Sequence, residues 1–324
     1  MTLRLVITVD TEPDNQWTMP KPGDGPQKLT FDNTRNLGPL MEFFRQLHTP
    51  VTWLTSYSVA RDEASARVLR QAAAAGDEIG AHLHAWETPP FTPADAQAHP
   101  YIYEYEAAIR LEKLRTVTST LSDVFGAQPA SYRAGRWGID DIEYENLAAL
   151  GYSIDTSVVP GHSFRPSRGL ARGGPDFAAY LTGGPAGPSR VGPLWEVPVS
   201  VTTLGLLGSA GAPCARVFST RNDLLSRAGR KAMSVAGLCR MVWLRPLMHP
   251  RADLVHAARM LARRGAGLVN IMFHSSEAWQ GTSPRSRTSQ DVEHFYGDMS
   301  AIVRALRDES DLQGSTLRAA VASE

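Results

Sequence analysis

Two carboxylates end the first apolar run of the chain. Residues 3–9 (LRLVITV) lead directly into Asp10 and Glu12. Side chains two apart on a strand point to the same side, so these two carboxylates are expected to project together. Burying such a pair is costly unless a cation or a proton lies between the groups. The spacing therefore indicates a cation site or a site of proton transfer.

Histidines stand at the ends of two further apolar runs. His82 and His84 close the segment 77–84 (DEIGAHLH), and His274 closes 267–274 (GLVNIMFH). Imidazole and carboxylate groups together are typical ligands of Zn²⁺. Two acids and these histidines at strand ends predict a metal site with an acid–base partner.

Strand-like and helix-like segments alternate along the chain. The expected strands lie at 3–9, 50–56, 77–84, a short run ending at Arg133, 151–156, 194–201 and 267–274. The expected helices lie at 34–48, 62–75, 103–125, 140–150, 253–264 and 288–308. This alternation favours an α/β fold with about seven parallel strands, whose ligand site lies at the carboxyl ends of the strands. The acids, the histidines and Arg133 all stand at such ends.

The composition is that of an ordinary globular protein. The 324 residues are 43% hydrophobic and 20% charged, with zero formal net charge, which gives no general reason to expect a nucleic-acid partner. Cys214 and Cys239 are not spaced as a zinc knuckle or a redox pair. The N-terminal segment has no apolar stretch of signal-peptide length, and no 18-residue apolar span is found. The expected location is the cytoplasm.

Two segments interrupt the alternation within what we expect to be a single catalytic domain, 1–324. Residues 160–193 contain 14 glycines and prolines, which predicts a long loop. Residues 202–250 begin with an apolar, flexible stretch, and between 216 and 251 eight Lys and Arg residues accompany one acid. This insertion is either a solvated basic face or a cap that contacts a membrane surface or an anionic carrier.

Five short motifs together resemble those of the polysaccharide deacetylase family, the NodB-homology enzymes of carbohydrate esterase family 4. In chain order they are 9–12 (VDTE), 78–86 (EIGAHLHAW), 132–138 (YRAGRWG), 151–155 (GYSID) and 271–277 (IMFHSSE). The resemblance covers nearly the whole chain and implies a distorted (β/α) barrel with loop and helical insertions. It also implies a divalent metal, Zn²⁺ with Co²⁺ or Ni²⁺ as alternatives, and removal of the N-acetyl group of an amino sugar.

The resemblance implies a role for each motif residue. Asp10 is expected to act as the general base, Arg133 to hold it ionised, and His274 to act as the general acid. The implied metal ligands are Glu12, His82 and His84. The expected substrate-binding residues are Trp86, Arg136, Trp137, Asp155, Glu196 and Glu277, of which either Asp155 or Glu196 could orient His274.

Two features depart from the family pattern. Thr11 separates two acids that are adjacent in most members, so Asp10 and Glu12 could exchange roles. The second histidine follows His82 by two positions instead of four, so His84 is either a ligand or a neighbour of one. Two alternatives therefore stay open: a related C–N hydrolase acting on a non-sugar amide or a cyclic ureide, and a catalytically inactive binding protein. The sugar and the oligomeric state are not predicted.

Overall fold

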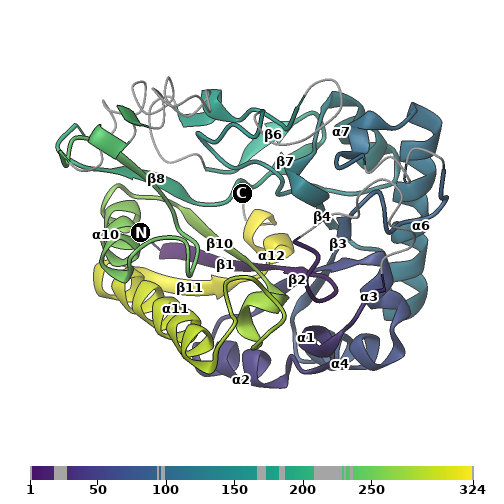
Figure 1. Cartoon of the computed structure of the whole chain (residues 1–324), viewed down its shortest axis with the longest axis horizontal. Helices are drawn as coiled ribbons and strands as arrows, with labels where there is room; N and C mark the ends of the chain where they lie inside the picture. Colours follow the sequence, from purple (N-terminus) through teal and green to yellow (C-terminus); the bar gives the residue numbers. More distant parts are fainter. Residues whose placement is uncertain are drawn as a thin grey trace.

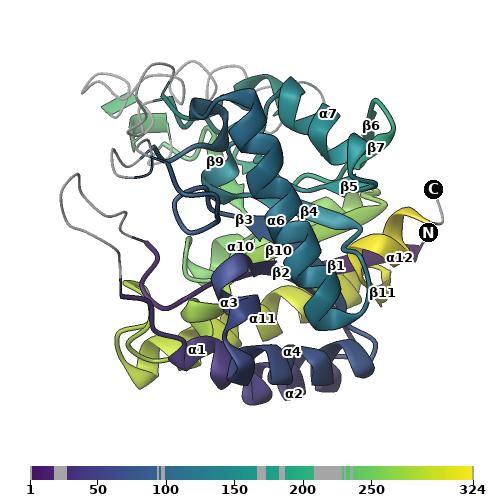
Figure 2. The same ribbon diagram turned by 90° about the vertical axis from the view of Figure 1, so that its right-hand side faces the viewer.

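A curved, mostly parallel sheet with helices packed around it forms the body of the protein (Figures 1 and 2). The structure, a computed structural model, describes residues 2–17, 28–92, 95, 99–165, 173–181, 187–207, 228–229, 231–233 and 236–322. In Figure 1, α10 and α11 lie on one side of the strands and α6 lies on the other. None of the described helices is long and apolar enough to cross a membrane.

The main sheet has nine strands, in the order β10-β1-β2-β3-β4-β5-β7-β6, with β11 pairing β1 beside this path. Their bounds are β1 (Thr2–Thr11), β2 (Val51–Ser56), β3 (Glu78–Leu83), β4 (Ser131–Ala134), β5 (Ile154–Asp155), β6 (Ser189–Val191), β7 (Leu194–Glu196), β10 (Leu268–His274) and β11 (Asp311–Ser315). Every pairing is parallel except that of β6 with β7. The expected α/β fold and its seven parallel strands are confirmed; β6 and β11 are additions.

Helices connect most of the strands, as the alternation predicts. Their bounds are α1 (Asp32–Arg35), α2 (Gly38–Gln46), α3 (Tyr57–Arg61), α4 (Glu63–Ala74), α6 (Ala107–Phe125), α7 (Asp141–Ala149), α10 (Arg251–Arg263), α11 (Ser289–Glu309) and α12 (Leu317–Val321). The single helix expected at 34–48 is divided into α1 and α2. Pro39 has no N–H to donate, so it fits only the first turn of a helix, and α2 begins there.

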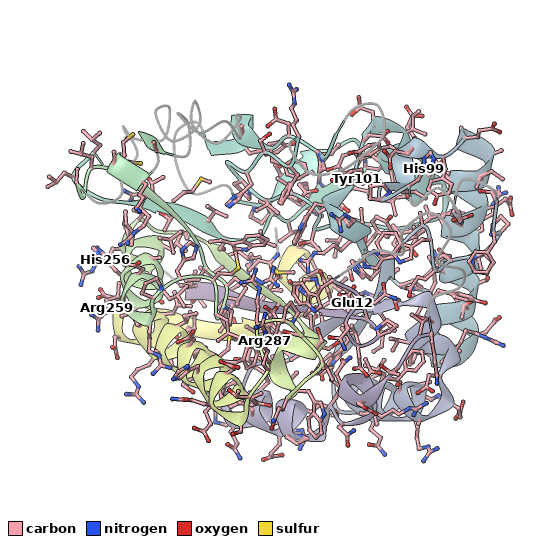
Figure 3. All side chains as sticks on the ribbon, viewed as in Figure 1. Glu12, His99, Tyr101, His256, Arg259 and Arg287 are labelled. Atoms are coloured by element: carbon pink, nitrogen blue, oxygen red, sulfur yellow. The ribbon has the colours of Figure 1, made fainter. Side chains whose placement is uncertain are left out.

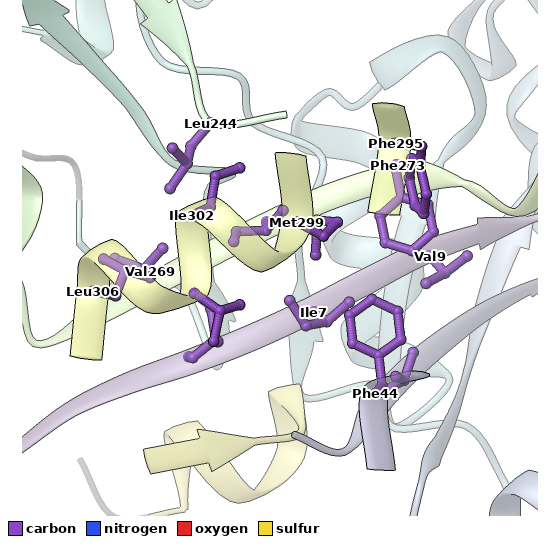
Figure 4. Close-up of a cluster of buried hydrophobic side chains, with 14 of the residues drawn as sticks. Ile7, Val9, Phe44, Leu244, Val269, Phe273, Phe295, Met299, Ile302 and Leu306 are labelled. Atoms are coloured by element: carbon purple, nitrogen blue, oxygen red, sulfur yellow. The ribbon is translucent and has the colours of Figure 1, made fainter. Parts of the chain in front are cut away.

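Side chains of β1 and β10 alternate between the outer and inner faces of the sheet. On the outer face, Ile7, Val9 and Phe273 pack against Phe295 and Met299 of α11 (Figure 4). All five are fully buried, and this apolar layer fixes which way each strand faces. The intervening residues, including Asp10 and His274, therefore face the interior of the curved sheet.

Asn270 of β10 joins the two ends of the curved sheet. Its backbone N–H donates to Ser200 Oγ at 2.9 Å, and its carbonyl accepts from the Ser200 N–H at 2.9 Å. Inside the barrel, its side chain accepts from Thr8 Oγ1 and donates to Thr156 Oγ1, both at 2.9 Å. One backbone–backbone bond and several bonds that involve side chains thus close the barrel at this seam in place of a regular strand ladder.

The two ends of the expected 202–250 insertion form an antiparallel pair of strands. They are β8 (Val201–Leu204) and β9 (Arg240–Trp243), and Leu204 and Val242 are buried in the main core. Residues 208–227, which hold much of the basic segment, lie outside the described residues. In the Gly/Pro-rich segment, a bridge between Ser163 and Asp176 orders the described part.

Candidate functional site

Three strand ends bring the predicted acids and histidines together. Asp10 of β1 is in register with His274 of β10, and His82 of β3 is in register with Arg133 of β4. Glu12 follows β1 by one residue and is 2% exposed. Figure 3 shows Glu12 within the body of the molecule, whereas His256 and Arg259 lie on its outer edge. The site occupies the carboxyl ends of the parallel strands.

Glu12, His82 and His84 form a compact group of metal-binding atoms. Glu12 Oε2 lies 2.7 Å from His84 Nε2 and 3.5 Å from His82 Nε2, and the two Nε2 atoms are 3.1 Å apart. A tetrahedral zinc ion with bonds of about 2.0–2.1 Å separates neighbouring ligand atoms by about 3.3 Å. The spacing of the three atoms therefore fits one such ion and leaves a coordination position open.

Hydrogen bonding and burial prepare the two imidazoles for this arrangement. His82 Nδ1 lies 3.0 Å from the Arg133 carbonyl, which only accepts, so Nδ1 carries a proton and the neutral ring has its lone pair on Nε2. Burial would lower the pKa of His82, but Asp10 and Glu12 outweigh this effect and raise the pKa. Burial lowers the pKa of His84 to about 4, which keeps its ring neutral near pH 7. Gly135 packs on this ring, and a Cβ there would lie 2.5 Å from His84 Nδ1.

Asp10 is held by a fully buried arginine. Arg133 donates from Nη1 to Asp10 Oδ1 at 2.6 Å, and its other donors bond Thr8 Oγ1 and the Thr156 carbonyl at 2.9 and 2.8 Å. Burial would raise the pKa of Asp10, but the charges of Arg133, His82 and His274 outweigh it and lower the pKa. Asp10 is therefore an ionised carboxylate whose Oδ2 faces His274 Nε2 at 3.8 Å.

His274 lies between the carboxylates and a second arginine. Its Nε2 is 3.4 Å from Glu12 Oε1, and its Nδ1 is 2.8 Å from Arg245 Nη2. A guanidinium only donates, so Nδ1 accepts and Nε2 carries the proton toward the carboxylates. Glu277 accepts from the His274 backbone N–H at 2.9 Å and from Arg245 Nη2 at 2.7 Å.

Glu277 stays ionised in this setting. Burial would raise its pKa, but the charge of Arg245 and the contacts with His274 hold the pKa at about 2. The expected site residue Glu277 is thus brought to His274. Sequence reasoning missed Arg245 because it counted this residue within a basic segment. Its position two residues after the end of β9 was the available signal.

Asp155 and Glu196, expected to orient His274, make their contacts elsewhere. Asp155 accepts from Ser157 Oγ at 2.7 Å, and Glu196 accepts from the Tyr144 hydroxyl of α7 at 2.9 Å. Asp155 is in register with Tyr132 of β4, and Glu196 is in register with Asp155. Tyr132 packs in the core under α6 and α7, on the outer face of the sheet, so both acids lie on that face. Burial raises the pKa of Asp155, and burial with the neighbouring Asp155 raises that of Glu196 well above its ordinary value.

Aromatic rings border the group of acids and histidines. The predicted residue Trp86 packs on His84 with ring centroids 4.3 Å apart. The guanidinium carbon of Arg133 lies 5.1 Å from the centre of the ring of Trp137, the other predicted residue. Trp17, which sequence reasoning missed, packs on His274 with ring centroids 4.3 Å apart.

The turn after β4 holds two residues in an uncommon backbone conformation. Arg136 and Trp137 have φ angles of 54° and 66°, which cost about 1–3 kcal/mol each in a residue other than glycine. The turn directs Arg136 over the Tyr101 ring at 6.0 Å and Trp137 against Trp243 at 5.4 Å. Such strain is concentrated at functional sites, and here it positions two of the predicted substrate-binding side chains.

Glu87 is a further acid beside the site that the motifs did not indicate. It is 7% exposed, and its Oε2 accepts from Ser58 Oγ at 2.7 Å and from Gln16 Nε2 at 3.4 Å. Burial, with a contribution from the charge of Glu12, raises the pKa of Glu87 to about 7. Its carboxyl group therefore changes charge near neutral pH.

The comparison with solved structures finds proteins that are named as carbohydrate deacetylases. A Mycobacterium smegmatis protein described as a polysaccharide deacetylase is 16% identical, with a TM-score of 0.54 over 98% of this chain and 87% of that one. The chitin deacetylase of Colletotrichum lindemuthianum is 11% identical, with a TM-score of 0.46 over 98% and 86%. No protein-family model and no curated protein matches the sequence. The likeness to the first structure confirms the barrel that the motifs implied, and at this identity it concerns the fold alone.

Proposed function

We propose that this protein is a metal-dependent hydrolase that removes the N-acetyl group from an acetamido sugar. The observation that carries the proposal is the grouping of Glu12, His82 and His84 beside the Asp10–Arg133 pair and His274. A set of metal ligands with an open position, an ionised base and a histidine proton donor is what amide hydrolysis requires. We take residues 1–324 as one catalytic domain.

Glu12, His82 and His84 would hold the metal ion, with Zn²⁺ as the first candidate and Co²⁺ or Ni²⁺ as alternatives. The bound ion supplies Lewis acidity, which polarises an amide carbonyl and lowers the pKa of a coordinated water. Glu12 enters this role ionised, because its pKa lies well below the ordinary value: burial would raise it, but the charge of His274 and the hydrogen bonds with His82 and His84 outweigh this effect.

Asp10 would take the proton of the attacking water. Its pKa is lowered, so it is ionised at neutral pH, and the bond from Arg133 occupies Oδ1 and leaves Oδ2 free to accept. The same guanidinium fixes the orientation of the carboxylate through its bonds to Thr8 and Thr156. Positioned general bases contribute about 10²–10⁴-fold to a rate.

His274 would pass the proton on its Nε2 to the departing amine nitrogen. Nε2 faces the same space as the Asp10 and Glu12 carboxylates. A neutral ring that gave up this proton would become an imidazolate, so the acid is the imidazolium form. Nδ1 then carries a proton, the Arg245 donor has to turn away from it, and the Glu277 carboxylate, whose Oε2 lies 3.5 Å from Nδ1, is the anionic partner. The rings of Trp17, Trp86 and Trp137 offer apolar faces of the kind on which sugars pack.

The test combines metal content with acetate release. Elemental analysis would compare the wild type with His82→Ala and with His256→Ala, a matched control on the exposed face of α10. Acetate release would be measured from a panel of acetamido sugars, and hydrolysis of the C–N bond from non-sugar amides and cyclic ureides. We expect near-stoichiometric metal in the wild type and in His256→Ala, loss of metal in His82→Ala, and acetate from at least one sugar.

The other outcomes overturn the proposal in different ways. Metal without acetate, together with cleavage of a non-sugar amide or a ureide, would assign the chain to another class of C–N hydrolase. A wild type that binds no metal, and stays inactive after addition of zinc or cobalt, would make it a catalytically inactive binding protein.

A further inference from the structure

Two arginines lie beside the aromatic ring that packs on the proposed general acid, and one of them, Arg245, also donates to His274 Nδ1 at 2.8 Å. Trp17 packs on His274, and the guanidinium carbons of Arg245 and Arg285 lie 5.7 and 5.9 Å from the centre of the Trp17 ring. Arg245 is 4% exposed, and the Arg285 side chain is 35% exposed. One arginine is thus enclosed by the protein, and the other borders solvent.

These two cations share one carboxylate. Glu277 accepts from Arg245 at 2.7 Å, and its Oε1 lies 3.5 Å from Arg285 Nε. Burial and the nearby charge of Arg245 lower the pKa of Arg285, which shows that the guanidinium groups are close enough to repel. One anion between two cations leaves a positive excess in a partly desolvated place, where an opposite charge is favoured.

Buried donors around Arg245 have no acceptor among the described residues. Arg245 Nε is one of them, and Trp243 Nε1 is another. The guanidinium of Arg245 lies 5.3 Å from the Trp243 ring, so both donors belong to one small region. Buried N–H groups rarely lack a partner, and here a ligand with oxygen acceptors would supply it.

We infer that Arg245 and Arg285 form a subsite for an anionic group of the substrate, a phosphate or a carboxylate. The inference rests on the proposed function and narrows its substrate class to anionic acetamido sugars. Guanidinium groups bind such oxyanions through charge-assisted hydrogen bonds. Because the Trp17 ring packs on His274 and lies beside both guanidinium groups, the anion would bind next to the reacting amide.

The experiment compares neutral and anionic substrates that share one sugar. Acetate release would be measured from N-acetylglucosamine, its 1-phosphate, its 6-phosphate and N-acetylmuramic acid, which carries a carboxylate. Binding of the same four compounds to the metal-free protein would be measured by calorimetry, which needs no turnover. Arg285→Gln is the test variant, Arg285→Lys keeps the charge, and Arg287→Gln is a matched exposed control (Figure 3).

We expect at least one anionic sugar to bind about tenfold or more tightly than N-acetylglucosamine. Arg285→Gln should remove that preference through KM and Kd and leave N-acetylglucosamine unaffected, Arg285→Lys should keep part of it, and Arg287→Gln should keep it whole. Equal use of neutral and anionic sugars by the wild type, or an equal loss for both in Arg285→Gln, would overturn the subsite. If no compound releases acetate, the proposed function fails, and the calorimetric preference still decides the subsite.

Discussion

Two pairs of buried acids, each pair at strand ends, have pKa values that are shifted in opposite directions. Asp10 and Glu12 lie inside the barrel, and Asp155 and Glu196 lie under α7 on its outer face. Inside, arginine and histidine neighbours lower both pKa values in spite of burial. Under α7, burial raises both pKa values, and the neighbouring Asp155 raises that of Glu196 further. The comparison teaches that an acid at a strand end becomes a reactive carboxylate only if its face of the sheet supplies cations.

Replacing one aspartate of each pair by asparagine should give the largest difference in kcat. Asp10→Asn removes the proposed base and should lower kcat about 10²–10⁴-fold. Asp155→Asn should leave kcat unchanged, because its carboxyl group contacts Ser157 and not the metal-binding group. Acetate release by metal-loaded protein would be measured, with metal content determined for both variants. Equal losses of activity would return Asp155 to the catalytic site and remove the contrast.

How far the site could be predicted depends on the length of its strands. β1 has ten residues, and its outward Ile7 and Val9 leave no doubt that Asp10 faces inward. β5 has two residues and β7 has three, which is too short for an alternating pattern to assign a face. The sequence therefore placed Asp10 and Glu12 at a strand end, but it put Asp155 and Glu196 only within expected strands and did not assign the face on which those two lie.

Arg245 shows a second reason why sequence reasoning stopped short. The strand that precedes it, β9, pairs with β8 across a separation of more than thirty residues in the chain, and Arg245 comes to lie beside His274. The local composition indicates only a basic, partly apolar segment at 202–250. Contacts between residues this distant in sequence are set by tertiary packing, which one sequence does not encode as a local pattern.

Removing the cation from inside the barrel should cost the most stability. Arg133→Met deletes a fully buried guanidinium and leaves Asp10 as an unpaired buried carboxylate, which should lower the free energy of unfolding by about 3–5 kcal/mol. Arg115→Met, on the exposed surface of α6, should change it by less than about 0.5 kcal/mol. Urea unfolding monitored by circular dichroism gives both values. A small loss in Arg133→Met would mean that Asp10 is not held as a charged group.

The raised pKa of Glu196 predicts how the stability of the neutral variant Glu196→Gln depends on pH. An acid whose pKa is raised on folding stabilises the protein below its unfolded pKa of about 4.5, and this contribution is lost as pH rises through the folded pKa. Glutamine does not ionise, so Glu196→Gln does not lose stability in this way. Its stability relative to the wild type should therefore increase above pH 4.5, by up to about 1.4 kcal/mol per pH unit. Urea unfolding from pH 5 to 8 measures the difference, and a flat difference would mean that Glu196 keeps an ordinary pKa.

The smallest expected effect concerns the hydroxyl group that faces Glu196. Tyr144→Phe removes one hydrogen bond of 2.9 Å and should cost about 0.5–1.5 kcal/mol while Glu196 is protonated. A bond to a charged acceptor contributes about 1.5–3 kcal/mol, so the loss should grow at high pH once Glu196 ionises. Made in the Glu196→Gln background, the same change should show no growth with pH. A loss that grows equally in both backgrounds would place the titrating group elsewhere and would end the contrast between the two pairs of acids.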